Sequence, residues 1–594
     1  MIHLLRRYGA IAIALIIITQ ISIVSCTPRE IPRKSQLVLA TLGDPKTFNP
    51  ALNQEFPNVF IFTFEGLTRE NGITGEIEPA LAESWEISRD RKRVVFTLRK
   101  GLKWSDGQPL TADDVVFTYK EVVFNPDIPT DAKDPLRIGE RRSFPTVRKL
   151  GDPRLVEFTL PEPFAPFLRA TGVSILPAHV LRKSVLSLDG EGNPQFTSTW
   201  NTGTQLSEIV VNGPYKIESY NPSERVIFTR NPYYWRQDAE GNQLPYIDRI
   251  VWQVVESTET QLLQFRSGTL DIMGDSRPLR PEYFSLLKRE EKRGKFTIKI
   301  GGSSSSTTFM AFNLNQAKNE RGEPFVDPVK SRWFNSKEFR QAIAHALDRQ
   351  RMVNNIFRGI GVRENSPVSV QSPYFLSPEA GLKVYEYNLE KAQELLRSAG
   401  FQYDKQGLLL DAEGNQVRFT LLTNAGNKIR EAIGVQVKQD LGKIGIPVDF
   451  RPIAFSTLVS KLTNTRDWEA HIIGFTGGVE PHNGANLWTS SGGSHLFNQG
   501  PQPGETSIQA WQVSDWEREI DRLFVKGARE LDEQKRKKIY AEFQQLVQEQ
   551  LPLIFLVNEV TMMAVRDRVT GLKYSGLPSW GLWNIYEVKI DENG

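Results

Sequence analysis

Cysteine is almost absent from this chain of 594 residues, in which Cys26 is the only one. A single thiol cannot close an internal disulfide, and it cannot supply a cluster of thiolate ligands for a metal ion. Architectures that depend on disulfide bridges or on several cysteine ligands are therefore excluded.

A dominant charge of either sign is also missing. The chain contains 73 Lys and Arg residues against 70 Asp and Glu residues, a net charge of +3, and no long run of one sign. Without residues 1–25, which include Arg6 and Arg7, the net charge falls to +1, because 71 basic residues then face 70 acidic ones. A nearly neutral chain lacks the basic footprint of a nucleic-acid-binding protein, so we expect no nucleic-acid partner.

The sequence also lacks the G-x-S-x-G and H-E-x-x-H motifs that mark common hydrolases. Nothing singles out a catalytic pair among the 70 acidic residues, so an exported hydrolase remains only as an alternative of another class. Internal repeats are absent as well, which argues against a structural adhesin.

What is present indicates a large globular protein. Hydrophobic residues make up 39% and charged residues 24% of the chain. At about 150 residues per domain, the length predicts roughly four units. Segments with helical and strand periodicity alternate throughout, so we expect a mixed α/β or α+β fold.

The first thirty residues predict export. Arg6 and Arg7 precede an apolar stretch from Gly9 to Ile23, the pattern of a secretory signal. The sequence Ile-Val-Ser-Cys that ends at Cys26 resembles a lipobox, in which the cysteine thiol accepts the lipid. We therefore expect a protein anchored by lipid at Cys26 on the periplasmic or extracellular face of a bacterial membrane. An uncleaved transmembrane anchor is the alternative, and it also places the body outside the cytoplasm.

The stretch from Ala82 to Val123 has the clearest local pattern. Val94, Phe96 and Leu98 alternate with polar or opposite-facing residues, which predicts a strand paired in a hairpin with residues 84–87. Thr111 followed by Asp114 predicts a capping box, because the hydroxyl and the carboxylate can satisfy free amides at a helix start.

The same stretch, AESW…FTLRKGLKWSDGQPLTADDVVF, resembles the signature of the family 5 extracellular solute-binding proteins over some forty residues. Further segments are similar to the family at residues 212–217, 230–235, 309–313 and 339–350. The resemblance implies a two-lobed fold of the type II periplasmic-binding-protein class, with an extra domain and a hinge between the lobes. It also implies a monomeric, cofactor-free receptor that delivers its ligand to the membrane permease of an ABC importer.

Domain boundaries are predicted from this resemblance and from composition. The Gly301–Ser306 stretch has the composition of a flexible linker, and we expect the chain to cross there from the first lobe to the second. The expected segments are a signal peptide at 1–25, a tether at 26–36, the first lobe at 37–75, 209–302 and 501–594, the extra domain at 76–208, and the second lobe at 303–500.

The loop from Ile472 to Trp488 is the most informative candidate for ligand recognition. In peptide-binding members, the resemblance implies an aspartate here that pairs with the α-ammonium group of the ligand. This chain has Gly478 at that place, and Phe475 replaces the usual Trp. Glu480 could substitute, because a carboxylate shielded from water binds a cation strongly; otherwise the ligand lacks a free amine.

The remaining candidates come from other segments similar to the family. Phe48 lies in a proline-rich loop that also fits a plain connector, and Glu65 could line the cleft or merely sit on a helix surface. The complete set of expected ligand-binding residues is Phe48, Glu65, Asn313, Phe475, Gly477, Gly478, Glu480, His482 and Trp488.

Two patterns suggest metal sites at first sight. His471, His482 and His495 lie in one region, but their spacing matches no compact zinc motif, so we expect packing roles. The string D-x-E-G-N at Asp189, Asp238 and Asp411 lacks the spacing and distal glutamate of a calcium loop, so we expect turns. We therefore predict no metal.

We expect a lipid-anchored receptor that closes two lobes over an oligopeptide or dipeptide. Main-chain hydrogen bonds would give affinity without regard to sequence, and water-filled pockets would accept varied side chains. An oligosaccharide, an opine or a metal chelate remains the alternative ligand within the same transport role.

Overall fold

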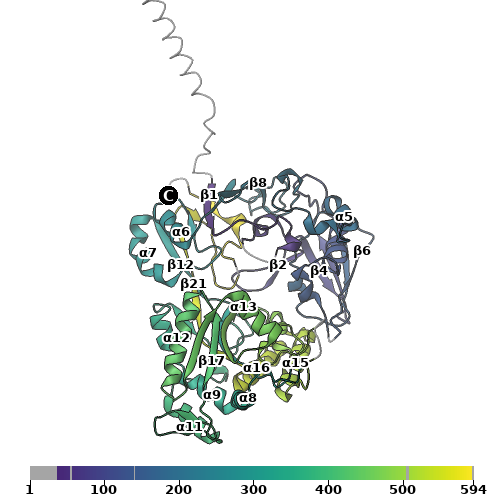
Figure 1. Ribbon diagram of the computed structural model, residues 1–594. Helices are drawn as coiled ribbons and strands as arrows, with labels where there is room; N and C mark the ends of the chain where they lie inside the picture. Colours follow the sequence, from purple (N-terminus) through teal and green to yellow (C-terminus); the bar gives the residue numbers. More distant parts are fainter. Residues whose placement is uncertain (1–35, 54–56, 140, 503–507, 579, 592–594) are drawn as a thin grey trace, which may run out of the picture.

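The computed structural model describes residues 36–53, 57–139, 141–502, 508–578 and 580–591. The expected signal peptide and Cys26 lie outside the described residues, as does all of the tether except residue 36. Among the described residues, no helix combines the length and the apolar character needed to cross a bilayer. The chain forms two lobes, one above the other in Figure 1.

The first lobe is built on two sheets that join the beginning, the middle and the end of the chain (Figure 1). The first sheet has the order β1 (Gln36–Thr41), β10 (Arg249–Val254), β9 (Arg225–Arg230) and β8 (Tyr215–Asn221). The second has the order β11 (Ile272–Met273), β21 (Val557–Arg566) and β12 (Phe296–Ser303). Helices α6 (Thr258–Arg266) and α7 (Pro281–Gly294) contribute to the same core as this second sheet.

The extra domain extends from the first lobe. Its antiparallel sheet has the order β4 (Ala82–Ile87), β5 (Arg93–Leu98), β7 (Leu155–Thr159) and β6 (Thr146–Lys149). Its apolar residues belong to one continuous cluster with those of the first sheet, so the two units share a core.

The local predictions in this domain are confirmed. β4 and β5 form the expected hairpin, with Val94, Phe96 and Leu98 buried. Thr111 and Asp114 form the expected capping box at the start of α3 (Ala112–Val116). The buried Asp114 carboxylate also accepts a hydrogen bond from the N–H of Ala178 (2.9 Å), which ties α3 to the start of α5 (Ala178–Leu186).

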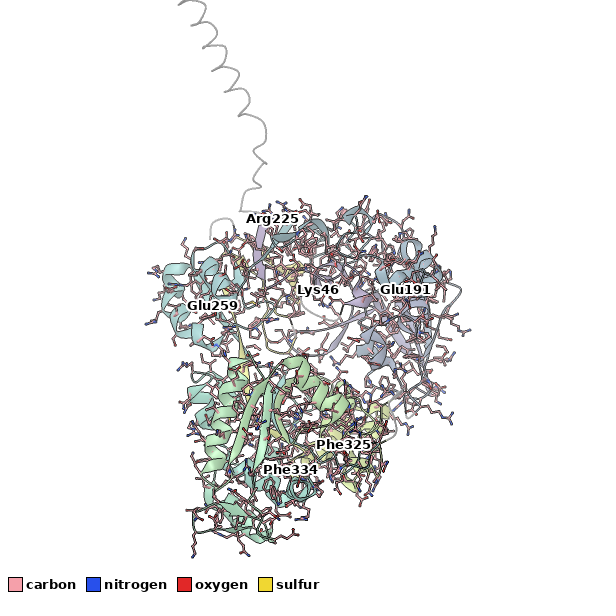
Figure 2. The ribbon with its side chains drawn as sticks, in the orientation of Figure 1. Lys46, Glu191, Arg225, Glu259, Phe325 and Phe334 are labelled. Carbon is pink, nitrogen blue, oxygen red and sulfur yellow. The ribbon has the colours of Figure 1, made fainter. Side chains whose placement is uncertain are left out.

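The second lobe contains a mixed five-stranded sheet covered by helices. The sheet order is β18 (Val448–Ile453), β17 (Phe419–Asn424), β19 (Ala470–Phe475), β13 (Thr307–Phe312) and β20 (Leu553–Phe555). The helices that pack in this lobe include α9 (Lys337–Ala346), α11 (Leu389–Ser398), α12 (Lys428–Gly442), α15 (Asp515–Arg529) and α16 (Glu533–Gln550). In Figure 2, Phe334 lies among the side chains of this lobe, while Arg225 and Glu259 mark the first lobe.

One domain boundary predicted from the sequence is wrong. The stretch 501–594 was expected to return to the first lobe, but Ile520 and Phe524 of α15 and Ile539 and Phe543 of α16 are buried in the core of the second lobe. α15 packs against α16, and α16 packs against α9 of the same lobe. The chain returns to the first lobe with β21.

The chain passes between the lobes twice, and the two passages lie side by side. The first connects β12 to β13 at residues 304–306, and the second connects β20 to β21 at Leu556. The N–H of Ser304 donates to the carbonyl of Glu559 (2.9 Å), and the side-chain amide of Asn558 donates to the carbonyl of Ser304 (2.8 Å). Gly302 has φ +90°, at a bulge in β12. The chain therefore crosses between the lobes within the Gly301–Ser306 stretch, where the sequence predicts the hinge.

The lobes also touch away from the hinge, through a contact that we call the clasp: Glu162, Phe164 and Ala165 of the extra domain against His482, Ala528 and Arg529 of the second lobe. The guanidinium of Arg529 donates to both carboxylate oxygens of Glu162 (2.9 and 2.6 Å). The N–H of Ala165 donates to the carbonyl of Ala528 (2.7 Å). The ring of Phe164 meets that of His482 edge-on, with 5.1 Å between centroids. The clasp and the hinge bound the space between the lobes.

Candidate functional site

Four adjacent cavities form a row along the space between the lobes. The Gly478 cavity, of about 300 Å³, shares Thr307 and Thr476 with the Phe475 cavity, of about 220 Å³. The Phe475 cavity shares Ile429 and Glu559 with a cavity of about 350 Å³ lined mainly by the first lobe. At the other end, a cavity of about 730 Å³ lies between the extra domain and the second lobe. Such a row can hold an elongated ligand.

The main chain that follows β19 forms one wall of the Gly478 cavity. β19 ends at Phe475, and Thr476, Gly477 and Gly478 continue along the cavity. Their backbone N–H and C=O groups have no hydrogen-bond partner among the described residues. Unpaired backbone groups at a strand end can pair with an extended ligand.

Only one of the two glycines in this wall, Gly477, is required by the surrounding structure. A Cβ at Gly477 would collide with the carbonyl oxygen of Ser305, so only glycine allows this close approach to the hinge. A Cβ at Gly478 would meet only the side-chain amide of Asn483, at 3.5 Å. Position 478 therefore has room for a side chain that this protein does not carry.

Glu480 lines the same cavity, but its carboxylate already has a cationic partner within the protein. Oε1 accepts a hydrogen bond from the guanidinium of Arg536 (2.5 Å) and another from the N–H of His482 (3.0 Å). Glu480 is 3% and Arg536 5% exposed, so the pair is buried. Arg536 also donates to the hydroxyl of Tyr374 (2.8 Å) and the carbonyl of Gly527 (2.8 Å). The geometry therefore favours a structural pair over the ligand role expected for Glu480.

A second carboxylate, which sequence reasoning missed, also lines this cavity. Glu364 follows β14 (Gly361–Arg363), and its Oε2 accepts a hydrogen bond from the N–H of Thr308 (3.2 Å). Its side chain faces the cavity, and no cationic group lies within ion-pair distance among the described residues. Desolvation by the surrounding protein raises the pKa of Glu364 to about 8. The residues around Glu364 form no motif that would have indicated from the sequence that its carboxylate lines this cavity.

The Phe475 cavity combines one cationic and one acidic side chain. Arg430 donates to the side-chain oxygen of Asn424 (2.9 Å), and burial lowers its pKa. Burial raises the pKa of Glu559. Phe475 itself packs against Phe309, with 5.7 Å between ring centroids. This cavity is therefore polar with one aromatic wall.

Three of the expected ligand-binding residues line none of the four cavities. Phe48 is fully buried in the first lobe, and Asn313 donates to the carbonyls of Arg466 and Trp468 (both 3.0 Å). Glu65 accepts hydrogen bonds from the hydroxyl of Tyr234 (2.7 Å) and the indole of Trp235 (2.7 Å). The geometry gives all three structural roles.

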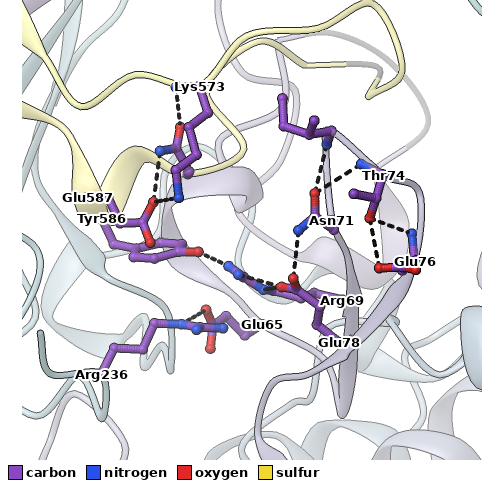
Figure 3. A network of polar contacts seen from close by, with 12 residues as sticks. Glu65, Arg69, Asn71, Thr74, Glu76, Glu78, Arg236, Lys573, Tyr586 and Glu587 are labelled. Carbon is purple, nitrogen blue, oxygen red and sulfur yellow. Dashed lines mark hydrogen bonds and ion pairs between the residues drawn. The ribbon is translucent and has the colours of Figure 1, made fainter. Parts of the chain in front are cut away.

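Figure 3 shows that Glu65 also contacts Arg236, near a polar network that links the first lobe to the end of the chain. Arg69 in this network pairs with Glu78 (2.7 Å) and donates to the hydroxyl of Tyr586. These contacts stabilise the lobe, and none of them faces the Gly478 cavity.

The side chains of His471, His482, His495 and Trp488 are mostly buried and contact neighbouring residues of the protein. His471 lies against Trp468, with 4.4 Å between ring centroids, and burial lowers its pKa to about 3. His495 is hydrogen-bonded to Glu517 (2.9 Å). His482 lines the 730 Å³ cavity, and Trp488 lines the Gly478 cavity with 4% exposure. The part of the chain that the structure describes contains no group of three or more His, Cys, Asp or Glu side chains placed to hold a metal ion.

The three D-x-E-G-N strings are turns. At Asp189, Asp238 and Asp411, Oδ1 of the aspartate accepts hydrogen bonds from the N–H groups two and four residues later. The carboxylates are therefore used within their own loops, as turn chemistry predicts.

Comparison with known proteins gives the family. The sequence profile of the bacterial extracellular solute-binding proteins, family 5 Middle, matches residues 76–495. A relative from Deinococcus radiodurans named probable ABC transporter-binding protein is 30% identical over 559 residues, which cover 89% of this chain and 88% of the relative. The oligopeptide-binding protein AppA of Bacillus subtilis is 26% identical, covering 92% of this chain and 90% of AppA.

Solved structures agree on the fold. The structure of AppA with a nonapeptide has a TM-score of 0.68 and covers 93% of this chain and 98% of AppA, at 24% identity. The periplasmic binding protein MelB from Agrobacterium fabrum, solved with stachyose, has a TM-score of 0.72 and covers 94% of this chain and 85% of MelB, at 22% identity. Profile, relatives and fold thus agree, and this chain belongs to the family 5 extracellular solute-binding proteins.

Proposed function

We propose that this protein is the solute-capturing component of an ABC importer and that it binds an extended peptide between its lobes. The observation that carries the peptide assignment is the unpaired main chain at Thr476–Gly478, which follows β19 along a cavity. A peptide backbone can pair with it by strand addition, whatever its side chains are. The names of the relatives from Deinococcus radiodurans and Bacillus subtilis support the same role.

Capture proceeds by closure about the hinge. A ligand that contacts both lobes binds the closed form more tightly than the open form, and so shifts the population toward it. The cavities beside the Gly478 cavity give room for side chains and for water that bridges them. The permease receives the ligand from the closed form, and the ligand is released unchanged. The receptor acts as a monomer held at the membrane by lipid on Cys26.

A non-peptide solute is the second candidate, and one observation favours it. Gly478 carries no carboxylate, and Glu480 is neutralised by Arg536. A ligand without a free amine would need neither group. An oligosaccharide, an opine or a metal chelate would then take the same place in the cleft.

The test uses protein that lacks residues 1–26. A ligand at 100 times its dissociation constant stabilises the folded state by about 2.7 kcal/mol, so a matching peptide raises the melting temperature. If no di- to pentapeptide shifts the melting temperature, the peptide assignment is rejected. Mass spectrometry of the recovered pool separates a receptor, which returns peptides intact, from a hydrolase, which consumes them.

A further inference from the structure

The charges that line the Gly478 cavity are unbalanced. Glu364 and Glu480 face it, and no lysine, arginine or histidine lines it. Glu480 is neutralised from behind by Arg536, at 2.5 Å. Glu364 has no such partner among the described residues, so the cavity presents one uncompensated acidic group to whatever enters.

The backbone on both sides of the hinge holds Glu364 in place. Its N–H donates to the carbonyl of Leu556 (3.0 Å), and its Oε2 accepts from the N–H of Thr308 (3.2 Å). Leu556 lies at the second passage between the lobes, and Thr308 lies just after the first. The carboxylate is therefore fixed at the base of the cleft, where closure brings the lobes together.

Further acceptors surround the same space. The hydroxyl oxygen of Thr307 is buried beside Glu364 and has no partner that meets hydrogen-bond geometry among the described residues. Across the cavity, the carbonyls of Thr476, Gly477 and Gly478 are also unpaired. An ammonium group has three donors and no acceptor, so it suits a site made of one carboxylate and several oxygen acceptors.

The energetics point the same way. Desolvation raises the pKa of Glu364 to about 8, so the empty cavity holds mainly the protonated acid at neutral pH. A ligand ammonium group favours the ionised form, because the carboxylate then accepts a charge-assisted hydrogen bond from it.

We propose that Glu364 binds a primary ammonium group of the captured solute, in the same cavity that Gly478 lines. This inference rests on the proposed function, because it requires a solute in this cleft. It assigns the protein to ligands that carry a free amine, although Gly478 has no carboxylate and Glu480, the substitute suggested by the sequence, is paired with Arg536.

The experiment compares two probes and three proteins. The probes are a pool of tri- to pentapeptides with free N-termini and the same pool after N-acetylation. The proteins are the wild type, Glu364→Gln, and Glu390→Gln as the control, because Glu390 is an exposed acid of α11 that lines none of the four cavities. Dissociation constants are measured by calorimetry, and circular dichroism with thermal unfolding checks that each variant folds.

The wild type and Glu390→Gln are expected to bind the free-amine pool at least tenfold more tightly than the acetylated pool. Glu364→Gln is expected to lose this preference, with free-amine binding at least tenfold weaker and acetylated binding unchanged. Equal binding of both pools by the wild type, or an unchanged preference in Glu364→Gln, overturns the inference.

If neither pool binds the wild type, the peptide assignment fails, and simple ligands decide the role of Glu364. Linear alkylamines are then compared with the matching alcohols by thermal shift. Stabilisation by the amines alone that disappears in Glu364→Gln supports the inference. Equal or absent stabilisation overturns it.

Discussion

The buried pair of Glu480 and Arg536 gives the sharpest prediction on stability. We consider Arg536→Met, which keeps much of the side-chain length and removes the charge. Arg536 is 5% exposed, and its guanidinium donates to Glu480, Tyr374 and Gly527. After the substitution, the N–H of His482 is the one hydrogen-bond donor left to the carboxylate of Glu480 among the described residues.

Removing one partner of a buried ion pair typically costs 3–5 kcal/mol, because the other charge is left unpaired. We therefore expect Arg536→Met to lower the free energy of unfolding by about that amount. The double variant Arg536→Met/Glu480→Leu removes both charges of the pair. We therefore expect its free energy of unfolding to be at least about 2 kcal/mol higher than that of Arg536→Met. The remaining deficit reflects the lost partners of Tyr374 and Gly527, at about 1 kcal/mol each.

The assay is urea unfolding followed by tryptophan fluorescence, with Arg522→Met as the matched control. Arg522 pairs with Glu519 on the exposed side of α15, where a pair contributes about 0–1 kcal/mol. With a urea dependence of about 3 kcal/mol per molar, Arg536→Met should move the midpoint by about 1–2 M. A shift no larger than that of Arg522→Met would refute the reasoning. So would a double variant that is no more stable than Arg536→Met.

Four further predictions follow from other features. Gly477→Ala should lower the melting temperature and weaken ligand binding, because the added Cβ collides with Ser305. Gly478→Ala should leave the melting temperature nearly unchanged. Equal effects of the two substitutions would contradict this account of the cavity wall. In the clasp, Glu162→Arg and Arg529→Glu should each favour the open form, seen as a larger radius of gyration by small-angle X-ray scattering, and the double variant should restore the wild-type value. Burial raises the pKa of Asp275 to about 7, so between about pH 4 and 7 the folded state keeps a proton that the unfolded state has lost. The free energy of unfolding should therefore fall as pH rises through this range. Asp275→Asn should flatten that slope. Cys26→Ser should release the protein from the membrane fraction, while retention there would indicate a transmembrane anchor.

Local structure was predictable where a few neighbouring residues decide it. The hairpin and the capping box within Ala82–Val123 depend on alternation and on one hydroxyl–carboxylate pair, and both are formed. The crossing between the lobes at the glycine and serine stretch was also predictable, because the composition and the family resemblance both indicated it.

Lobe membership and ligand contacts were less predictable, because they depend on distant partners. The amphipathic pattern of α15 and α16 indicates a buried face, but not the lobe that buries it. Glu480 and Arg536 are 56 residues apart, so only the fold reveals that this acid is already neutralised. Glu364 is placed by backbone contacts at the hinge, and no local pattern encodes such a position. Phe48 and Asn313 match the family, yet a family match does not distinguish a core residue from a cleft residue.

The return of the chain through β21 has a consequence for biosynthesis. β21 lies between β11 and β12, so one sheet of the first lobe lacks its central strand until residues 557–566 have been made. The second lobe, in contrast, is a contiguous stretch and has all its strands once β20 has emerged. This sheet of the first lobe is thus the last to be completed, and the newly made chain cannot reach its full tertiary structure until β21 has been synthesised. A secreted protein gains from this order, because a translocation channel accepts a polypeptide most readily before its tertiary structure is complete.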